Sequence, residues 1–258
     1  MVINEMRYFS FILLILPICF FSNANARDLR VFAAASTVHL IEDLAKSWEK
    51  VSGQKVRVVL GSSGALARQM HMGAPADLFF SAAKLWVDYL IREKIADPGS
   101  RRTVATNQLV LVAASGVQVP QDFYPRKDIL PLLGTRDRIA LGDPAHVPAG
   151  HYAKQALVSL GLWNKVERRT ARARNVRLAL ALVEQNETPI GIVYRSDVQH
   201  RRRVSIIYSF PEKLHSPIEY QIVARKNAAS GTNEFLTHLS LVNAHAILRK
   251  HGFSPGGT

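Results

Sequence analysis

Hydrophobic and polar positions along this chain follow two alternating patterns. Short apolar runs of strand length are each followed by a turn and then by a segment in which apolar residues recur every three or four positions. In the segment 40–50, for example, Ile41, Leu44 and Trp48 are apolar at helical spacing. This succession of strand, turn and helix predicts an α/β fold with mainly parallel sheets flanked by helices on both faces.

The same patterns set the expected bounds of the elements. Strands are expected at 29–33, 55–60, 76–80, 108–114, 138–141, 190–194, 204–210 and 218–224. Helices are expected at 40–50, 65–72, 83–93, 150–160, 176–186 and 233–251, the last of them ending at Gly252.

The first 26 residues have the pattern of a secretory signal. Arg7 precedes an apolar run at 8–21, and Ala24-Asn25-Ala26 forms an A-x-A cleavage pattern with Arg27 as the expected start of the mature chain. An apolar run of about 14 residues is short for a bilayer, which needs about 20. We therefore expect a signal peptide at 1–26, with a membrane anchor as the alternative.

Cysteine use and size limit the fold further. The single cysteine, Cys19, lies inside the expected signal, so the mature chain is expected to hold no disulfide, zinc cluster or thiol nucleophile. About 230 mature residues of this hydrophobic content can bury a core as one large domain or as two lobes of about 100 residues each.

The chain is strongly basic, with a formal net charge of +13 and an isoelectric point near 10.2. The basic residues gather at Arg101-Arg102, at Arg168, Arg169, Arg172, Arg174 and Arg177, and at Arg201-Arg202-Arg203. No aromatic residues interleave these clusters and the chain carries an export signal, so nucleic-acid binding is not expected. The clusters are interpreted as solvated surface that could also steer anions or meet acidic partners or lipid headgroups.

Four short turns rich in small residues each precede an expected helix. They are Ala34-Ala35-Ser36-Thr37, Gly61-Ser62-Ser63-Gly64, Val147-Pro148-Ala149-Gly150 and Asn175-Val176-Arg177. A helix start presents free backbone N–H groups and the positive end of the helix dipole, so converging starts form an anion pocket without a charged side chain. In open α/β sheets such turns lie at the carboxyl ends of the strands. The pattern therefore predicts an oxyanion receptor.

Several of these strings, in this order, also resemble one known family. The chain is similar to the periplasmic molybdate-binding proteins of ABC transporters from about Arg30 to Phe253. The motifs that carry the resemblance are Val31-Phe32-Ala33-Ala34-Ala35-Ser36, Gly61-Ser62-Ser63-Gly64-Ala65-Leu66-Ala67-Arg68-Gln69, Gly73-Ala74-Pro75-Ala76-Asp77-Leu78-Phe79, Gly142-Asp143-Pro144-Ala145-His146-Val147-Pro148-Ala149-Gly150, Asn175-Val176-Arg177 and Gly191-Ile192-Val193-Tyr194.

The resemblance implies a two-lobed periplasmic-binding-protein fold of type II that closes on its ligand by a hinge. The chain would cross between the lobes near Thr106 and near Ser196. Lobe 1 would then comprise 27–105 and 197–258, and lobe 2 would comprise 106–196.

The resemblance also implies the binding residues. Ser36 and Ser63 would supply hydroxyl and backbone donors from lobe 1, Ala149 and Val176 would supply backbone N–H groups from lobe 2, and Tyr194 would add its hydroxyl near the hinge. These groups would contact the oxygens of molybdate rather than the metal. Gly64-Ala65 departs from relatives that carry further hydroxyl residues there, which would remove at most a secondary contact.

The chemistry of this residue set favours a fully deprotonated dianion. A pocket made only of donors suits molybdate, tungstate or sulfate, whereas monohydrogen phosphate carries a proton that needs an acceptor. Asp143 could supply such an acceptor, but its place in Gly142-Asp143-Pro144 favours a role in a turn. The choice of molybdate over sulfate rests on the resemblance alone, so a sulfate or other oxyanion carrier remains the alternative.

Other interpretations of the same residues stay open or fail on spacing. Ser36 and Ser63 alone would be interpreted as helix caps, and Tyr194 as a core aromatic residue. A secreted serine hydrolase is disfavoured because position 65 is alanine, which breaks the G-x-S-x-G spacing. The nine histidines form no H-E-x-x-H motif, which disfavours a metalloenzyme.

The expected protein is thus a non-catalytic, monomeric receptor without a cofactor. It would capture molybdate, or tungstate, in the periplasm and dock in its closed form on an inner-membrane ABC permease. The chain has no phosphate-binding loop of the Gly-x-x-x-x-Gly-Lys-Ser/Thr type, so the ATPase would be a separate protein.

Overall fold

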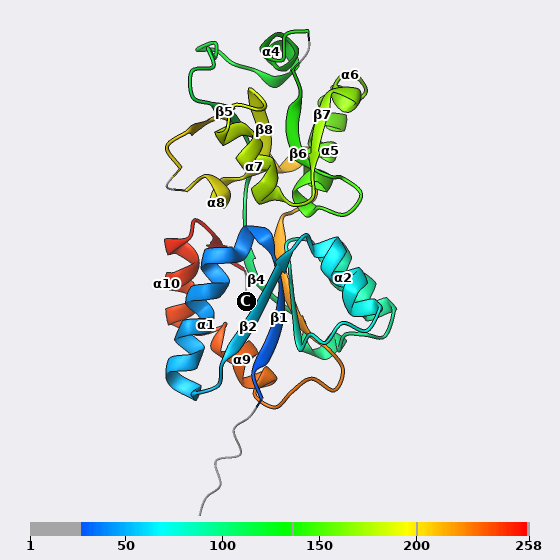
Figure 1. Cartoon of the computed structure of the whole chain (residues 1–258), viewed down its shortest axis with the longest axis vertical. Coiled ribbons are helices and arrows are strands. Elements are labelled where there is room, and N and C mark those ends of the chain that lie inside the picture. Colours follow the sequence, from blue (N-terminus) through cyan, green and yellow to red (C-terminus); the bar gives the residue numbers. More distant parts are fainter. Residues whose placement is uncertain (1–26, 136, 200, 257–258) are drawn as a thin grey trace, which may run out of the picture.

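The computed structural model describes residues 27–135, 137–199 and 201–256. Figure 1 shows two lobes, one above the other, each built on its own sheet with helices around it. The predicted two-lobed α/β fold is therefore confirmed. The predicted signal peptide at 1–26 lies outside the described residues.

The first lobe contains a six-stranded sheet. Across the sheet the strands are β11 (Ser254–Pro255), β4 (Arg102–Thr106), β10 (Glu219–Ala224), β3 (Leu78–Ser81), β1 (Leu29–Ala34) and β2 (Val56–Gly61). The helices of this lobe are η1 (Ala35–Thr37), α1 (Val38–Ser52), α2 (Ser63–His71), α3 (Lys84–Arg92), η2 (Pro98–Ser100), α9 (Thr232–His238) and α10 (Val242–Lys250).

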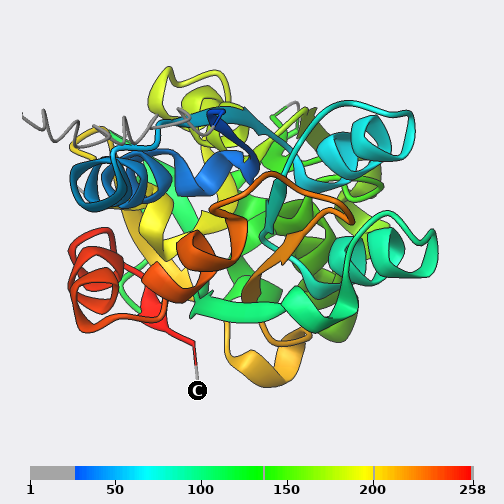
Figure 2. The same ribbon diagram turned by 90° about the horizontal axis from the view of Figure 1, so that it is seen from below.

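Strand β1 shows how side-chain alternation divides the core of this lobe. Leu29, Val31 and Ala33 pack in the cluster that includes α1, whereas Phe32 packs in a second cluster with α2 and α3. Seen from below, the blue α1 and the red α10 lie on one side of the sheet and the cyan α2 and turquoise α3 on the other (Figure 2). Helices therefore cover both faces.

The second lobe contains a five-stranded sheet. Its strands are, in order, β7 (Thr170–Ala173), β6 (Ile139–Gly142), β8 (Ile190–Tyr194), β5 (Leu109–Ala114) and β9 (Val204–Ser209). Its helices are α4 (Pro125–Leu132), α5 (Pro148–Ser159), α6 (Trp163–Val166), η3 (Glu167–Arg169), α7 (Val176–Glu184), α8 (Arg195–Val198) and η4 (Glu212–Leu214). Residues of β5 and β8 are buried throughout, as expected for strands covered on both faces.

Both sheets are mixed rather than mainly parallel. β1 runs parallel to β2 and β3, and β6 runs parallel to β7 and β8. In contrast, β10 runs antiparallel to β3 and β4, and β5 runs antiparallel to β8 and β9. The expectation of mainly parallel sheets was too simple, because β5 and β10 enter their sheets from the other lobe and not through a βα unit.

The chain crosses between the lobes twice. It passes from β4 to β5 between Thr106 and Leu109, and it returns from β9 to β10 between Ser209 and Glu219. The predicted return near Ser196 comes too early, since β9 pairs with β5 in the second sheet. The segment from Leu109 to Ser209 therefore belongs to the second lobe.

Two further expectations differ from the structure. The segment 233–251 forms two helices, α9 and α10, because Leu241 is extended between them with ψ of 156°. Strands β4 and β7 were not predicted, since both are short and carry arginine and threonine in place of a continuous apolar run. Within the described ranges, no helix has both the length and the apolar character that crossing a membrane requires.

The basic clusters have more than one role. Arg169 donates from Nη2 to the carbonyl oxygens of Leu133 at 2.8 Å and Gly134 at 2.9 Å, where α4 ends. Such contacts satisfy carbonyl groups that a helix end leaves free. Arg202 and Arg203, in contrast, are exposed. From the sequence, most of this charge was interpreted as solvated surface, which fits Arg202 and Arg203 but not Arg169.

Candidate functional site

One small cavity between the lobes brings together all five residues that the family resemblance implied. Ser36, Ser63, Ala149, Val176 and Tyr194 line it, and each is at most 3% exposed. The other lining residues are Ala34, Ala35, Gly61, Ser62, Ala82, Val147, Pro148 and Asn175. The cavity holds about 200 Å³ of empty space, its mouth included.

The first lobe contributes two serines that follow parallel strands. Ser36 lies in η1 directly after β1, and its Oγ accepts a hydrogen bond of 2.8 Å from the Tyr220 hydroxyl. Ser63 begins α2 after β2, and its Oγ accepts from the backbone N–H of Ala82 at 3.1 Å. The cap of α2 is Ser62, which accepts from Ala65 N–H, so neither predicted serine serves as a plain helix cap.

The second lobe contributes two helix starts. Ala149 is the second residue of α5, after Pro148, and Val176 is the first residue of α7. Asn175 caps α7 as expected, because its Oδ1 accepts from the N–H of Leu178 at 3.0 Å. The N–H groups of Ala149 and Val176 belong to first helical turns, which lack intrahelical acceptors.

Gly150 allows α5 to begin close to the end of β6. A Cβ atom at Gly150 would overlap the carbonyl oxygen of Gly142, and a Cβ at Gly142 would overlap Val147. Only glycine at both positions permits this approach of helix to strand. The start of α5, with Ala149, is thereby held at the cavity.

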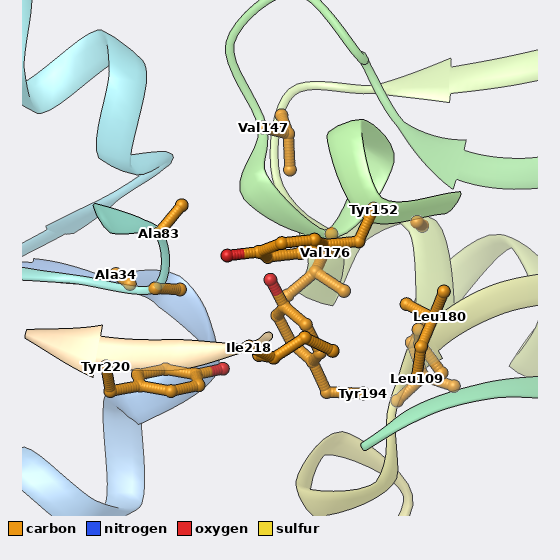
Figure 3. Close-up of a cluster of buried hydrophobic side chains, with 14 of the residues drawn as sticks. Ala34, Ala83, Leu109, Val147, Tyr152, Val176, Leu180, Tyr194, Ile218 and Tyr220 are labelled. Atoms are coloured by element: carbon orange, nitrogen blue, oxygen red, sulfur yellow. The ribbon is translucent and has the colours of Figure 1, made fainter. Parts of the chain in front are cut away.

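Tyr194 ends β8 with its hydroxyl at the cavity. The ring is 1% exposed, and within the described part of the chain the hydroxyl has no hydrogen-bond partner. Burial raises the pKa of this hydroxyl well above its usual value, so the group stays protonated and can donate. Figure 3 shows the Tyr194 and Tyr152 hydroxyl groups close together, on the side that faces Ala34 and Ala83.

Hydrogen bonds join the two lobes at positions away from the chain crossings. Gly64 N–H of α2 donates to the carbonyl oxygen of His146 at 3.1 Å, and Gln199 Nε2 donates to the carbonyl oxygen of Lys250 at 3.0 Å. A Cβ at Gly64 would overlap the ring of Trp86 and lie 2.6 Å from the His146 oxygen. The lobes are therefore in contact on both sides of the cavity.

No carboxylate is among the residues that line this cavity. Asp143 lies outside it, and its Oδ1 accepts from the N–H of Ala145 at 3.0 Å, as a turn residue does. Asp197 is buried behind Tyr194, where it accepts from the Tyr194 N–H at 3.2 Å and lies 3.1 Å from Nε of Arg177. Burial raises the pKa of Asp197 to about 6, against the opposing charge of Arg177.

A larger, basic cavity opens on the flank of the site and shares Ser36 with it. It holds about 620 Å³ of empty space, its mouth included, and its lining includes Arg177, Arg201, His39 and His251. Positive charge beside an anion cavity raises the local concentration of anions. In this cavity, however, each of the four side chains lies within 4 Å of a carboxylate, Arg177 of Asp197, Arg201 of Glu184, His39 of Glu42 and His251 of Asp43, so much of the positive charge is balanced locally.

Two residues behind the cavity were not predicted. Tyr220 of β10 bonds to Ser36 across 184 positions of sequence, and Asn107 lies at the first crossing between the lobes. Neither stands in a motif with a recognisable spacing, so no local signal indicated them.

Comparison with known proteins places the chain in a family. The family described as bacterial extracellular solute-binding protein matches residues 29–254. The molybdate-binding protein ModA of Escherichia coli (strain K12) is 41% identical over 233 residues, which are 90% of each chain. The protein of the same name from Haemophilus influenzae is 36% identical and covers 91% of this chain and 92% of its own.

A solved structure agrees with these relatives. The Azotobacter vinelandii periplasmic molybdate-binding protein superposes with a TM-score of 0.76 at 26% identity, over 89% of this chain and all of that one. The resemblance to molybdate-binding proteins is confirmed, and the chain belongs to the family of bacterial extracellular solute-binding proteins.

Proposed function

We propose that this protein binds molybdate in the cavity between its lobes, and tungstate in the same way. One observation carries the proposal: four helix starts and the unpartnered Tyr194 hydroxyl meet in one buried cavity with no carboxylate in its lining. The names of the relatives at 41% and 36% identity support molybdate as the anion.

The donor set explains how a dianion can be held without a cation. The Ser36, Ser63 and Tyr194 hydroxyl groups and the N–H groups of Ala149 and Val176 would each donate to an oxygen of the anion. Hydrogen bonds to a charged group contribute about 1.5–3 kcal/mol each, so five of them offset the loss of hydration. Closure of the lobes excludes water and completes this shell of donors.

The biological setting follows from the family. We propose that residues 1–26 export the protein to the periplasm, where it acts as a monomer and by binding rather than by catalysis. The closed, loaded form would deliver its anion to an inner-membrane ABC permease driven by a separate ATPase. Binding shifts the lobes toward the closed arrangement, which the permease can then distinguish from the open one.

Thermal unfolding of the mature chain from Arg27 onward tests the proposal. Molybdate, tungstate, sulfate and monohydrogen phosphate are added separately at matched ionic strength. A ligand at 100 times its Kd adds about 2.7 kcal/mol to the free energy of unfolding. We expect a clear rise in Tm with molybdate and tungstate, and little with the other two anions.

Two variants locate the effect. The double variant Ser36→Ala, Ser63→Ala should lose the molybdate-dependent rise, whereas Ser205→Ala, at an exposed position of β9, should keep it. A larger rise with sulfate would identify the protein as a sulfate carrier. Absence of a rise with every anion would exclude the proposed receptor role.

A further inference from the structure

A chain of hydrogen bonds leads from the first crossing between the lobes to Ser36. Asn107 Nδ2 donates to the hydroxyl oxygen of Tyr220 at 3.3 Å, and the Tyr220 hydroxyl lies 2.8 Å from Oγ of Ser36. Ser36 lines the cavity, whereas neither Asn107 nor Tyr220 does. The chain therefore acts on the cavity only through Ser36.

The direction of these bonds is set at Asn107. Its Oδ1 accepts the backbone N–H of Gln108 at 2.9 Å, which fixes the orientation of the amide. Its Nδ2 therefore faces Ser196 Oγ at 2.8 Å as well as Tyr220. Because an amide nitrogen can only donate, Tyr220 must accept from Asn107.

The bond from Asn107 to Tyr220 also determines the direction of the bond between Tyr220 and Ser36. Its side chain is fully buried, and burial raises the pKa of the hydroxyl well above its usual value, so the group keeps its single hydrogen. With its oxygen already accepting from Asn107, the hydroxyl hydrogen goes to the remaining neighbour, Oγ of Ser36. Figure 3 shows the Tyr220 side chain alongside its strand, with the hydroxyl at the end nearer to Tyr194, whose ring centroid lies 5.8 Å from that of Tyr220.

We propose that Asn107 and Tyr220 are positioning residues that make Ser36 present a hydrogen, and not a lone pair, to the bound anion. This inference rests on the proposed function. Ser36 accepts from Tyr220, so its own hydrogen is left for the cavity. Ser63 has the same arrangement, with Ala82 N–H as the fixed donor to its Oγ. Both serines of the first lobe are thus held as donors.

The consequence is a specificity that charge alone cannot supply. Molybdate and monohydrogen phosphate are both dianions near pH 8, but only the phosphate carries a hydrogen that needs an acceptor. A serine free to rotate could readily accept that hydrogen. A serine that accepts from Tyr220 keeps a second lone pair, but turning this lone pair toward the cavity would direct its own hydrogen away from the anion, which disfavours such an exchange. Asn107 and Tyr220 therefore lower the affinity of the cavity for anions that carry a hydrogen, relative to fully deprotonated ones.

Two substitutions test the direction of the Asn107–Tyr220–Ser36 hydrogen bonds: one reverses it, and the other removes the bond to Ser36. Asn107→Asp replaces the donor with an acceptor, so Tyr220 donates to it and Ser36 in turn donates to Tyr220, which leaves a Ser36 lone pair at the cavity. Tyr220→Phe removes the hydroxyl and lets Ser36 rotate. Ser196→Ala is the matched control, because it removes the other partner of Asn107 Nδ2 and leaves the bond to Tyr220 intact.

Calorimetry at pH 8 would give Kd values of the mature protein for molybdate, sulfate and monohydrogen phosphate. In Asn107→Asp the preference for molybdate over phosphate should narrow by about tenfold, and in Tyr220→Phe by about threefold. The molybdate to sulfate ratio should stay within about twofold of the parent in both, since neither anion carries a hydrogen. Ser196→Ala should keep both ratios.

The outcomes separate this inference from the function on which it rests. Equal losses for all three anions would assign Asn107 and Tyr220 a purely structural or electrostatic role and overturn the inference, while the receptor function would stand. A parent protein that does not bind molybdate would overturn both. If Asn107→Asp does not fold, Tyr220→Phe, which keeps the ring, decides alone.

Discussion

The two lobes prepare their parts of the site in opposite ways. In the first lobe, the Ser36 and Ser63 hydroxyl groups already have protein partners, Tyr220 and the Ala82 N–H. In the second lobe, the Tyr194 hydroxyl has no partner in the described part of the chain, although the side chain is buried. A buried polar group without a partner costs about 1–3 kcal/mol. In the first lobe each serine oxygen therefore already accepts one hydrogen bond and only its hydrogen is left for a ligand, whereas the Tyr194 hydroxyl of the second lobe gains its first partner when the anion arrives.

The largest effect is expected where the two lobes meet. In Gly64→Ala the new methyl group would overlap Trp86 and the His146 carbonyl oxygen, so the lobes cannot close and the donors of the second lobe stay away from the anion. We expect molybdate affinity to fall by about 100-fold or more, measured by calorimetry. The overlap with Trp86 lies within the first lobe, between α2 and α3, so the unfolding midpoint of the ligand-free protein should fall as well. Gly99→Ala in the same lobe, where a Cβ has room, is the control.

The comparison becomes sharper when one hydroxyl is removed from each lobe. Ser36→Ala and Tyr194→Phe should each weaken molybdate binding by about 10- to 100-fold, because each removes one hydrogen bond to a charged ligand. Their effects on the ligand-free protein should differ. Ser36→Ala leaves the buried Tyr220 hydroxyl without its acceptor and should lower the free energy of unfolding by about 1–3 kcal/mol. Tyr194→Phe should leave that free energy unchanged or raise it, as urea titrations would show. Equal destabilisation by both would contradict the contrast between the lobes.

Asp77 in the first lobe and Asp197 in the second are both buried, and their pKa values shift in opposite directions. Burial alone would raise the pKa of Asp77, but hydrogen bonds from Arg27, Arg30 N–H and Ala229 N–H lower it overall. Burial raises the pKa of Asp197 to about 6, from an ordinary value of 3.8. Asp77 therefore stabilises the fold above its ordinary pKa, and this stabilisation is lost as the pH falls through its lowered pKa. For Asp197 the stabilisation is present below 3.8 and is lost as the pH rises through about 6.

Denaturant unfolding across pH 3–7 measures this difference. Asp77→Asn should cost more stability at pH 7 than at pH 3, while the cost of Asp197→Asn should shrink between pH 4 and pH 7. The same pH trend for both variants would show that the two carboxyl groups do not differ as the structure indicates.

The smallest effects are expected within the basic clusters. Arg169→Gln removes donors from the carbonyl groups at the end of α4 and should lower the free energy of unfolding by about 1 kcal/mol. Arg202→Gln, at an exposed position, should change it by less than about 0.5 kcal/mol. Neither should change molybdate affinity in moderate salt. Thermal melts of the two variants side by side would distinguish a structural arginine from a surface one.

Local patterns carried much of the fold and the candidate site. Ser36, Ser63, Ala149 and Val176 stand at strand-to-helix turns, which the switch from a run of apolar residues to helical spacing marks in the sequence. The local pattern also placed Tyr194 at the end of an apolar strand, but its role in the site came from the family resemblance alone. What a local pattern cannot show is which strands pair across long stretches of chain.

Long-range pairing also explains what the sequence did not show. The resemblance placed the return crossing near Ser196, whereas the pairing of β9 with β5 assigns β9 to the second lobe. Tyr220 and Ser36 are 184 positions apart, so no motif or local spacing in the sequence indicates their hydrogen bond. The same holds for the mixed sheets, whose antiparallel halves depend on how β5 and β10 enter them.

The place of β10 in the first sheet has a consequence for the order of folding during synthesis. β10 lies between β3 and β4, so β4 cannot join the rest of that sheet until residue 224 has been made. The strands of the second sheet are contiguous in sequence, from Leu109 to Ser209, and can pair earlier. The six-stranded sheet of the first lobe is therefore completed last, when most of the chain has left the ribosome. Pulse-labelled hydrogen exchange during refolding would reveal this order, with protection of β5 and β8 before β4.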